Sequence, residues 1–313
     1  MFTNKTILVT GGTGSFGKEF VKEALTLNPQ KVIVFSRDEL KQHEMQLMYP
    51  NEPRLRFFLG DVRDRDRLYR AFEGVNIVVH AAALKQVPAA EYNPFEFVKT
   101  NVMGAQNVAD AAIDRNVEKV LALSTDKAVN PINLYGATKL CSDRLLLAAN
   151  RYSGTHPTKF SVVRYGNVAG SRGSVLPIFL KYRGTDTPVP VTDPSMTRFW
   201  ISLPQAVKFV IDSLDRMKGG EVFIPKLPTM SITDLVEALD CKYFVSGIRP
   251  GEKIHEALIA QEESRDTREF DTYYVIDAQA TAGTPVPPNF QYTSDQNQTK
   301  LTSWELHSMV STL

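Results

Sequence analysis

Apolar residues in the first half of the chain follow two alternating periods. Short runs rich in β-branched residues predict strands, and longer stretches with apolar positions three and four residues apart predict helices. Several strands are apolar on both faces, which is typical of a parallel sheet covered by helices on both sides. We therefore predict a doubly wound α/β fold. The expected strands are 6–10, 31–35, 55–59, 76–81, 119–123 and 159–164, and the expected helices are 16–27, 39–48, 65–72, 94–115 and 133–152.

The pattern changes after about Gly166, where prolines become frequent between two further expected helices, 204–217 and 232–239. We expect residues 1–166 to form a first domain, to which later segments return. Residues 167–313 should form mainly a smaller α/β lobe and a C-terminal segment. Residues 281–300 are rich in Gly, Pro, Asn, Gln, Thr and Ser, which predicts a surface loop.

Composition excludes several classes of protein. The 313 residues carry 36 Lys and Arg against 35 Asp and Glu, a formal net charge of +1. Surfaces that bind nucleic acid or anionic membranes usually make a domain strongly basic, so neither is expected as a partner. The only two cysteines, Cys141 and Cys241, lie far apart and near no histidine cluster, so no disulfide or metal site is predicted. An apolar strand at 6–10 in place of a signal peptide favours a cytoplasmic protein.

A glycine-rich turn lies between the first expected strand and the first expected helix. It reads Gly11-Gly12-Thr13-Gly14-Ser15-Phe16-Gly17. In this context glycines allow a tight turn and a close approach of the backbone, while the helix N-terminus faces a pyrophosphate. A plain glycine turn is the alternative, but the context favours a Rossmann-type dinucleotide site with contacts from Gly11, Thr13, Gly14, Ser15, Phe16 and Gly17.

The end of the second strand indicates which dinucleotide binds. An NAD site usually has an acidic residue there, whereas this chain has Ser36-Arg37-Asp38 followed by Lys41. Arg37 and Lys41 suit a 2′-phosphate, which favours NADP over NAD, although solvated surface charges would look the same. Turn or packing residues could also explain the further cofactor contacts that we expect after later strands, at Asp61, Val62, Ala81 and Ala82.

Tyr135 and Lys139 are the clearest catalytic candidates. They are four residues apart on an expected helix, which places them on one helical face after the fifth strand. An ammonium there can lower the pKa of the phenol and hydrogen-bond a ribose. The tyrosine can then take a proton from a substrate hydroxyl while nicotinamide takes the hydride from the same carbon.

With these motifs together, the chain resembles an extended short-chain dehydrogenase/reductase over essentially its whole length. The branch it resembles is the inverting UDP-N-acetylglucosamine 4,6-dehydratases of pseudaminic acid biosynthesis. That resemblance implies a tightly bound and recycled NADP, and a homo-oligomer built from dimers, with a hexamer as one candidate. The motifs that carry it are Gly11 to Gly17, Ser36 to Glu39, Gly60 to Asp64, His80 to Lys85, Ser124 to Lys127, Arg164 to Val168, Asp193 to Phe199 and Arg249 to Lys253.

Thr125-Asp126-Lys127 is the segment most informative about chemistry. Retaining sugar-nucleotide dehydratases of the superfamily carry Thr-Asp-Glu there, so Lys127 marks the difference. Oxidation at C4 acidifies the C5 proton; a desolvated, neutral Lys127 could remove it, and Asp126 could protonate the departing C6 hydroxyl. The resemblance implies inversion at C5, giving UDP-2-acetamido-2,6-dideoxy-β-L-arabino-hex-4-ulose. An exposed charge beside a turn is the structural alternative for Lys127.

The resemblance also implies the remaining contacts. For the substrate these are Lys85, Asn167, Arg172, Thr197, Arg198, Arg249 and Glu252, and further cofactor contacts come from Lys85, Leu123, Ser124 and Val168. Arg249 would meet the diphosphate and Glu252 a ribose hydroxyl, although ion pairs or solvated charges remain the alternative for each. Two other functions stay open. A UDP-sugar 4-epimerase needs the same chemistry at C4 without an acid and base at C5 and C6, and a dinucleotide sensor would need no catalysis.

Overall fold

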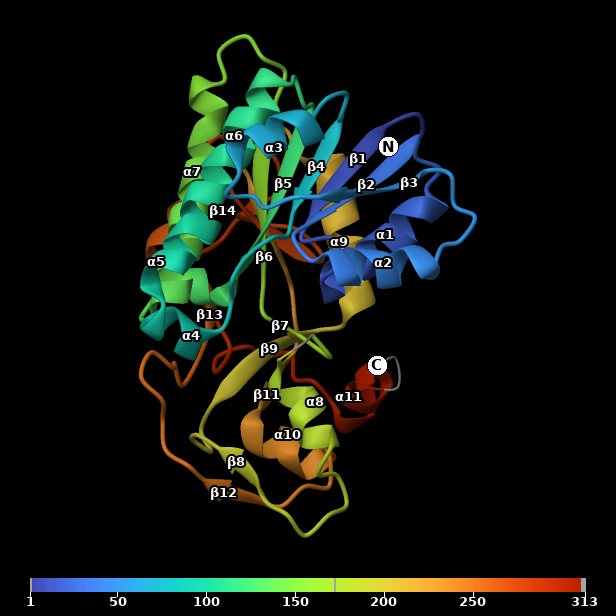
Figure 1. Ribbon diagram of the computed structural model, residues 1–313. Coiled ribbons are helices and arrows are strands. Elements are labelled where there is room, and N and C mark those ends of the chain that lie inside the picture. Colours follow the sequence, from blue (N-terminus) through green and yellow to red (C-terminus); the bar gives the residue numbers. More distant parts are fainter. Residues whose placement is uncertain (1, 172, 311–313) are drawn as a thin grey trace. The chain divides into compact units, whose positions relative to one another are not determined.

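The computed structural model describes residues 2–171 and 173–310. The chain divides into two compact units. Unit 1 comprises Met1–Ser124, Thr138–Val163 and Val207–Phe223, and unit 2 comprises Thr125–Ala137, Arg164–Ala206 and Ile224–Leu313. Each unit is described by itself below (Figure 1).

Unit 1 contains a parallel sheet whose strand order is β10-β6-β5-β4-β1-β2-β3. The strands β1 to β5 pair in parallel with their neighbours, and β10 pairs in parallel with β6. Chain order reverses between β1 and β4, which is where open α/β sheets bind ligands at the carboxyl ends of their strands. The strands are β1 (Thr6–Thr10), β2 (Lys31–Ser36), β3 (Leu55–Leu59), β4 (Ile77–His80), β5 (Lys119–Thr125), β6 (Lys159–Tyr165) and β10 (Val222–Pro225).

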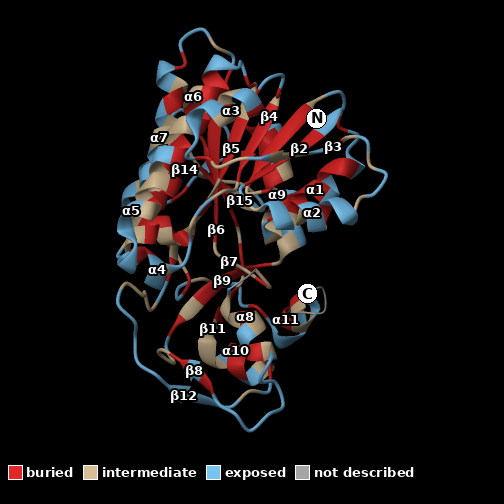
Figure 2. Ribbon diagram, in the orientation of Figure 1, coloured by how far each residue is buried: buried red, intermediate tan, exposed pale blue. Residues whose placement is uncertain are grey.

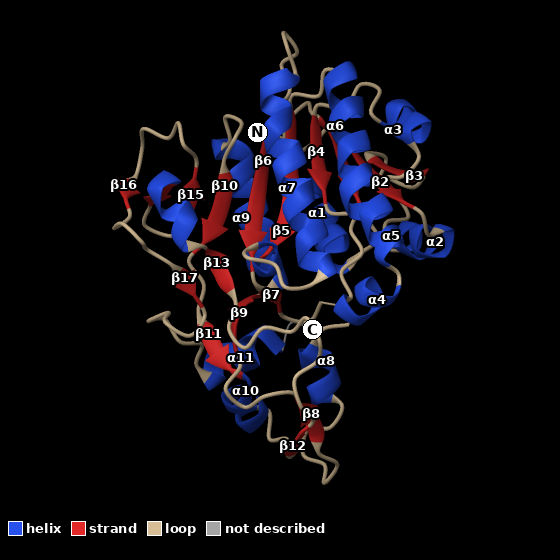
Figure 3. Cartoon of the chain, turned by 90° about the vertical axis from the view of Figure 1, so that its left-hand side faces the viewer, coloured by secondary structure: helices blue, strands red, loops and turns tan. Residues whose placement is uncertain are grey.

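Helices cover both faces of this sheet. Figures 1 and 3 show α6 and α7 on one face and α1 and α9 on the other. Helix α1 buries Phe20, Val21 and Ala24, whose spacing puts them on one side. Figure 2 shows the strands as buried and the outer helix surfaces as largely exposed. The predicted doubly wound α/β fold is therefore confirmed. The helices are α1 (Ser15–Thr26), α2 (Glu39–Leu47), α3 (Arg65–Ala71), α6 (Gly104–Asp114), α7 (Leu134–Tyr152) and α9 (Leu203–Arg216).

The expected helix over 94–115 is not one continuous α-helix. After the short helix α4 (Val87–Tyr92), the segment consists of α5 (Pro94–Phe97), a π-helical stretch η1 (Val98–Met103) and then α6. The buried Asn101 lies in η1; its side chain exchanges two hydrogen bonds of 2.9 Å with the backbone of Leu84 and donates to Thr138 Oγ1 at 3.0 Å. The widened turn thus places an amide that connects the segment after β4 to α7, and π-turns often occur at functional sites for such reasons.

Unit 2 consists of small sheets and short helices around its own core. The core includes Phe179, Trp200, Leu235 and Leu306, which are fully or almost fully buried. Strands β7 (Asn167–Val168) and β11 (Thr229–Ser231) flank β9 (Thr197–Ile201). The other elements are η2 (Asp126–Ala128), α8 (Val175–Leu180), β8 (Val189–Val191), α10 (Ile232–Ala238), β12 (Tyr243–Val245), β13 (Ala257–Ile259), η3 (Gln261–Asp266), β14 (Thr267–Glu269), β15 (Tyr273–Ile276), β16 (Thr284–Pro285), β17 (Tyr292–Thr293) and α11 (Ser303–Val310).

The prediction of a surface loop over 281–300 was wrong for its second half. The side chains of Tyr292 and Ser294 are buried, and β17 pairs with β13. The Tyr292 ring lies 4.8 Å from the Phe199 ring, and its hydroxyl donates to the carbonyl of Leu227 at 3.0 Å. The composition of the segment is mostly polar, so it did not indicate that Tyr292 would be buried. No helix within residues 2–171 and 173–310 is long and apolar enough to cross a membrane.

Candidate active site

The glycine-rich turn forms a close-packed cradle between β1 and α1 in unit 1. Gly11 has a φ of +67°, and a Cβ there would lie 3.0 Å from the Ala82 backbone. A Cβ on Gly17 would lie 2.5 Å from the Gly12 backbone, so the helix can start this close to the turn only with a glycine at position 17. Helix α1 begins at Ser15. This geometry fits a dinucleotide pyrophosphate, which would meet backbone N–H groups and the helix N-terminus.

Several predicted cofactor residues surround this cradle in unit 1. Thr13 is buried and its hydroxyl donates to Ser36 Oγ at 3.2 Å. The neighbouring Phe16 stacks on Phe20 with 5.9 Å between ring centroids. Gln42, which the sequence did not single out, donates to the Ser36 carbonyl at 3.0 Å and so fixes the end of β2. Of the other predicted residues in unit 1, Gly14 and Lys85 are exposed, Val62 is buried, and Leu123, Ala81 and Ala82 are partly buried.

The two cations proposed for a 2′-phosphate each have a carboxylate partner. Arg37 is exposed, and its Nη1 lies 3.6 Å from Asp61 Oδ2. The Lys41 ammonium pairs with Asp38, whose carboxylate also caps α2. Burial raises the pKa of Asp61, but Arg63 and Arg37 outweigh burial and the pKa is lowered. Surface ion pairs of this kind are weak enough to exchange for a phosphate.

The ends of β1, β4 and β5 carry a buried polar network. The Thr10 hydroxyl oxygen accepts from the N–H groups of Ala81 and Ala82 at 3.1 and 3.2 Å and lies 2.8 Å from His80 Nδ1. The hydroxyl proton therefore points to Nδ1, which leaves the ring proton of a neutral His80 on Nε2. Burial, with a smaller effect of the Lys139 charge, lowers the pKa of His80 to about 3. His80 thus holds a strand end in place and stays neutral.

Lys139 lies on α7 in the same unit and is buried. Burial lowers its pKa, which the carboxylate of Asp143 partly offsets. Asp143 in turn accepts a hydrogen bond of 2.5 Å from Ser124 Oγ at the end of β5. Asp143 was missed in the sequence because a single acidic residue one helical turn after Lys139 has no distinctive spacing.

Lys127 lies between two carboxylates in unit 2. Its ammonium is 3.0 Å from Asp126 Oδ1 and 3.1 Å from Glu256 Oε1, and both carboxylates are almost completely buried. Burial disfavours the charged lysine, but Asp126 and Glu256 outweigh burial and raise the pKa of Lys127. Without substrate the charged form of Lys127 is therefore favoured, and a neutral Lys127 next to the oxidised sugar stays a prediction. Thr125 supports the cluster by donating to Asp126 Oδ1 at 2.9 Å.

Tyr135 is buried in unit 2 near the start of α7. Burial and the proximity of Tyr135 raise the pKa of the neighbouring Tyr165 phenol. Gly136 follows, and a Cβ there would lie 2.0 Å from the Lys127 carbonyl oxygen. The first turn of α7 can therefore pack directly on the backbone of Lys127. The N–H of Gly136 donates to Asn133 Oδ1 at 2.8 Å, and Asn133 Nδ2 donates to the Gly251 carbonyl at the same distance.

Arg198, a predicted substrate contact, is bonded to the backbone of unit 2. It is buried on β9, and its guanidinium donates to the carbonyls of Thr197 and Ile254 at 2.8 Å and of Lys253 at 2.9 Å. These backbone contacts use the guanidinium to fix the segment that leads to Glu256. Arg198 therefore supports that segment, and its predicted substrate contact stays a prediction.

Three other predicted substrate residues, Arg249, Glu252 and Thr197, have partners within unit 2. Arg249 and Glu252 form a pair with 2.7 Å between Nη2 and Oε1, which lowers the pKa of Glu252 despite its partial burial. The Thr197 hydroxyl lies 2.8 Å from His255 Nδ1 and 2.7 Å from Ser294 Oγ. Asn167 and Val168 form β7, and Arg172 lies outside the described residues.

Comparison with known proteins gives the family. The family described as polysaccharide biosynthesis protein matches residues 7–278. The chain therefore belongs to this family of extended short-chain dehydrogenases/reductases. A Campylobacter jejuni protein named UDP-N-acetylglucosamine 4,6-dehydratase (inverting) is 52% identical, over 95% of this chain and 94% of the relative. A Rickettsia felis protein named UDP-glucose 4-epimerase is 43% identical, over 88% of this chain and 84% of the relative.

Solved structures of this superfamily share the fold. Pen from Bacillus thuringiensis has a TM-score of 0.93 and 38% identity, covering 100% of this chain and 98% of Pen. A dTDP-glucose 4,6-dehydratase from Streptomyces venezuelae, solved with NAD bound, has a TM-score of 0.71 and 25% identity, covering 80% of this chain and 86% of that one.

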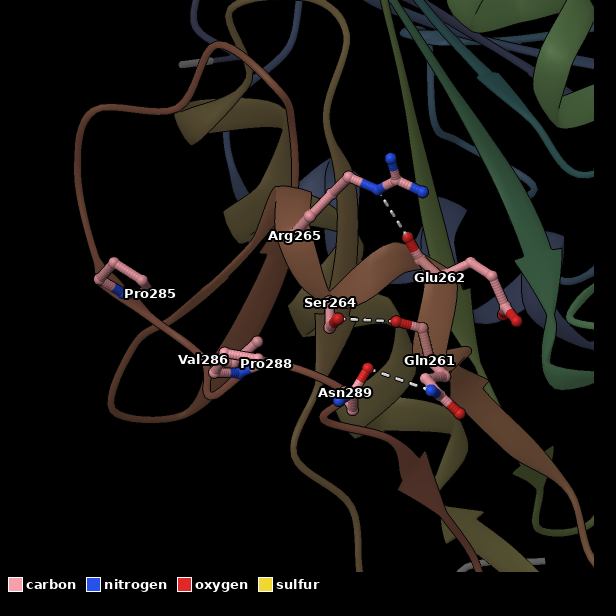
Figure 4. Close-up of a pocket in the computed structure, with 8 residues that line it drawn as sticks. All are labelled: Gln261, Glu262, Ser264, Arg265, Pro285, Val286, Pro288 and Asn289. Carbon is pink, nitrogen blue, oxygen red and sulfur yellow. Dashed lines mark hydrogen bonds between the residues drawn. The ribbon is translucent and has the colours of Figure 1, made fainter.

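A surface pocket of about 540 Å³ in unit 2 lies apart from the predicted site residues of this dehydrogenase/reductase (Figure 4). Figure 4 shows Gln261 Nε2 donating to Asn289 Oδ1, a hydrogen bond of 3.1 Å between η3 and the segment before β17. None of the residues that line this pocket is one that the sequence predicts for catalysis or binding. Among residues 2–171 and 173–310, no group of three or more His, Cys, Asp or Glu side chains could hold a metal ion.

Gly136 gives a test of the packing around Lys127. We expect Gly136→Ala to reduce activity strongly and to lower stability by about 1 to 3 kcal/mol, because the added methyl group must displace the Lys127 carbonyl. Steady-state kinetics and thermal unfolding measure the two effects. Cys141→Ala, an exposed position on the same helix, is the control. Native activity in Gly136→Ala would show that this contact does not position Lys127.

Proposed function

We propose that the protein is an NADP-dependent UDP-N-acetylglucosamine 4,6-dehydratase that inverts C5, a hydro-lyase. The product would be UDP-2-acetamido-2,6-dideoxy-β-L-arabino-hex-4-ulose. The observation that carries the proposal is the contact of 3.0 Å between the Lys127 ammonium and the almost completely buried Asp126 carboxylate, a pair that could supply an acid and a base for loss of water. The 52% identity to proteins named as inverting dehydratases supports the same reaction.

The bound nicotinamide dinucleotide would supply the hydride chemistry at C4 and C6. Tyr135 would accept the proton of the C4 hydroxyl, and Lys139 one turn later on α7 would favour the ionised phenol. Burial lowers the pKa of Lys139, yet Asp143 favours its charged form. Asp143 therefore helps to keep a positive charge on this helix.

Asp126 and Lys127 would form the acid and base for loss of water. At rest they are a carboxylate and an ammonium, and one proton transfer across their 3.0 Å contact gives a carboxylic acid and a neutral amine. The amine then takes the C5 proton, while the acid gives its proton to the departing C6 hydroxyl, which leaves as water. Both groups thereby return to their resting charges. A sugar that excludes water from the pair would favour the uncharged form, because burial penalises both charges.

Substrate contacts are proposed for the residues that the sequence predicts, beginning with the pair of Arg249 and Glu252. Arg249 has an exposed side chain, with Glu252 as its partner, and suits a diphosphate bound at the surface of unit 2. Glu252 would then accept from a ribose hydroxyl. Lys85, Asn167, Thr197 and Arg172 stay as predictions for the sugar and the diphosphate.

NADP is proposed over NAD because β2 ends at Ser36 and Arg37 follows it, where an NAD site usually has an acidic residue. We expect denatured, purified protein to release mainly NADP, as measured by chromatography and mass spectrometry. Arg37→Ala should shift the bound dinucleotide toward NAD, with the exposed Arg144→Ala as control. Release of NAD alone from the native protein would contradict this choice.

Product analysis tests the function directly. Incubation with UDP-N-acetylglucosamine should give a 4-keto-6-deoxy sugar, whose C6 methyl signal NMR detects. The second candidate is a UDP-sugar 4-epimerase, which the 43% identity to a protein of that name supports. An epimerase would return a C4 epimer that keeps its C6 hydroxyl and has no ketone. Formation of that epimer alone would reject the dehydratase.

A further inference from the structure

Glu256 is a buried acidic residue that belongs to none of the sequence motifs. It directly precedes β13, which packs against η2, where Asp126 and Lys127 lie. Its side chain is only 3% exposed, and Oε1 lies 3.1 Å from the Lys127 ammonium. Within residues 2–171 and 173–310, Oε2 has no hydrogen-bond partner. Burying a carboxylate is unfavourable for folding unless it is paired, and Lys127 is the cation that pairs with Glu256.

The backbone holds Glu256 in a fixed position. Its N–H donates to Ser294 Oγ at 2.9 Å, and its carbonyl accepts from the N–H of Ser294 at 2.8 Å. Arg198 fixes the carbonyls of Lys253 and Ile254 just before it. The carboxylate therefore meets Lys127 from a rigid segment, on an element different from the one that carries Asp126.

We propose that Glu256 is a positioning residue for Lys127, which orients the lysine amine and increases its affinity for a proton. The proposal rests on the function proposed above. When Lys127 is neutral, one of its two N–H bonds can donate to Glu256 and the other to Asp126. Asp126 is then a carboxylic acid that accepts this hydrogen bond through its unprotonated oxygen, and the nitrogen lone pair points away from both side chains, where it can accept the C5 proton. A base with greater proton affinity also removes a carbon-bound proton more readily.

The charges around Lys127 set the direction of the effect. Asp126 and Glu256 raise the pKa of Lys127, whereas burial and Arg198 lower it. Lys253 is a further cation close to the cluster, and its ammonium donates to the Val129 carbonyl at 2.6 Å. Removing the Glu256 charge should therefore lower the pKa of Lys127, because Asp126 alone would oppose burial and two neighbouring cations.

Lysine acylation measured against pH tests this without any substrate. Native protein and Glu256→Gln are treated with an amine-acylating reagent across a pH series, and peptide mass spectrometry follows Lys127. Losing one carboxylate next to an ammonium should move the midpoint of labelling down by about 1 to 3 pH units. Lys208, exposed on α9, is the reference within each digest, and Glu269→Gln, which removes another lysine partner in unit 2, is the matched control.

The variants also separate a positioning role from a structural one. We expect Glu256→Gln to lower kcat by at least about tenfold with little change in KM, and Glu256→Asp to recover part of kcat. If Glu256→Gln does not fold, Glu256→Asp carries the labelling test and should give an intermediate midpoint. An unchanged midpoint for Lys127 would overturn the proposal. Because labelling needs no turnover, that result differs from the failure of native protein to convert UDP-N-acetylglucosamine, which would reject the function instead.

Discussion

Lys127→Ala is expected to lower kcat for dehydration by about 10²- to 10⁴-fold, the usual range for loss of a general acid or base. The variant removes the group that we propose takes the C5 proton, and it leaves Asp126 and Glu256 as two buried carboxylates without their shared cation. Tyr135 and Lys139 remain, so oxidation at C4 should still proceed. Single-turnover absorbance should therefore show reduced nicotinamide accumulating while NMR shows no C6 methyl group.

Lys208→Ala, on the exposed side of α9, is the matched control and should keep native kinetics. Thermal unfolding distinguishes a lost catalytic group from a lost fold, since two uncompensated carboxylates also reduce stability. If Lys127→Ala keeps its turnover, no base at C5 is required. The 4-epimerase would then become the better function.

Tyr135→Phe is expected to lower kcat by a similar factor, about 10²- to 10⁴-fold, but at an earlier step. The phenylalanine keeps the buried ring and loses only the phenol oxygen that we propose accepts the C4 proton. No reduced nicotinamide should accumulate in a single turnover, in contrast to Lys127→Ala. The absorbance signal therefore separates the two variants even when both make no product.

The matched control for this variant is Tyr152→Phe, which removes an exposed hydroxyl at the end of the same helix. It should leave kcat and KM unchanged. Accumulation of reduced nicotinamide in Tyr135→Phe at the native rate would mean that another group accepts the C4 proton. The role of Tyr135 would then be structural.

The features that local spacing encodes could be predicted from the sequence. The glycine turn needs its glycines where the backbone comes close, and the spacing of Tyr135 and Lys139 follows the helical repeat. The predicted strands and helices followed from hydrophobic periodicity, with ends shifted by one or two residues, but no strand after 159–164 was predicted. The π-helical stretch was not predictable, because it arises from the contacts of Asn101 with the Leu84 backbone rather than from the pattern of its own segment.

The contacts that tertiary structure creates could not be predicted. Glu256 is far from Lys127 in the sequence and has no motif around it, so only folding shows that the two are in contact. Arg198 belongs to a motif, but only the folded structure shows that it is buried and donates to three backbone carbonyls. The charge of Lys127 also depends on tertiary contacts. The sequence predicted that burial would lower its pKa, whereas the two neighbouring carboxylates raise it.

One measurement tests the central claim that Asp126 and Lys127 perform an inverting loss of water. The enzyme is incubated with UDP-N-acetylglucosamine in deuterated water, and the product is analysed by NMR at an early time. The account predicts a 4-keto-6-deoxy sugar with solvent deuterium at C5 and the inverted configuration there. A product with no deuterium at C5, or with the original C5 configuration, would contradict it.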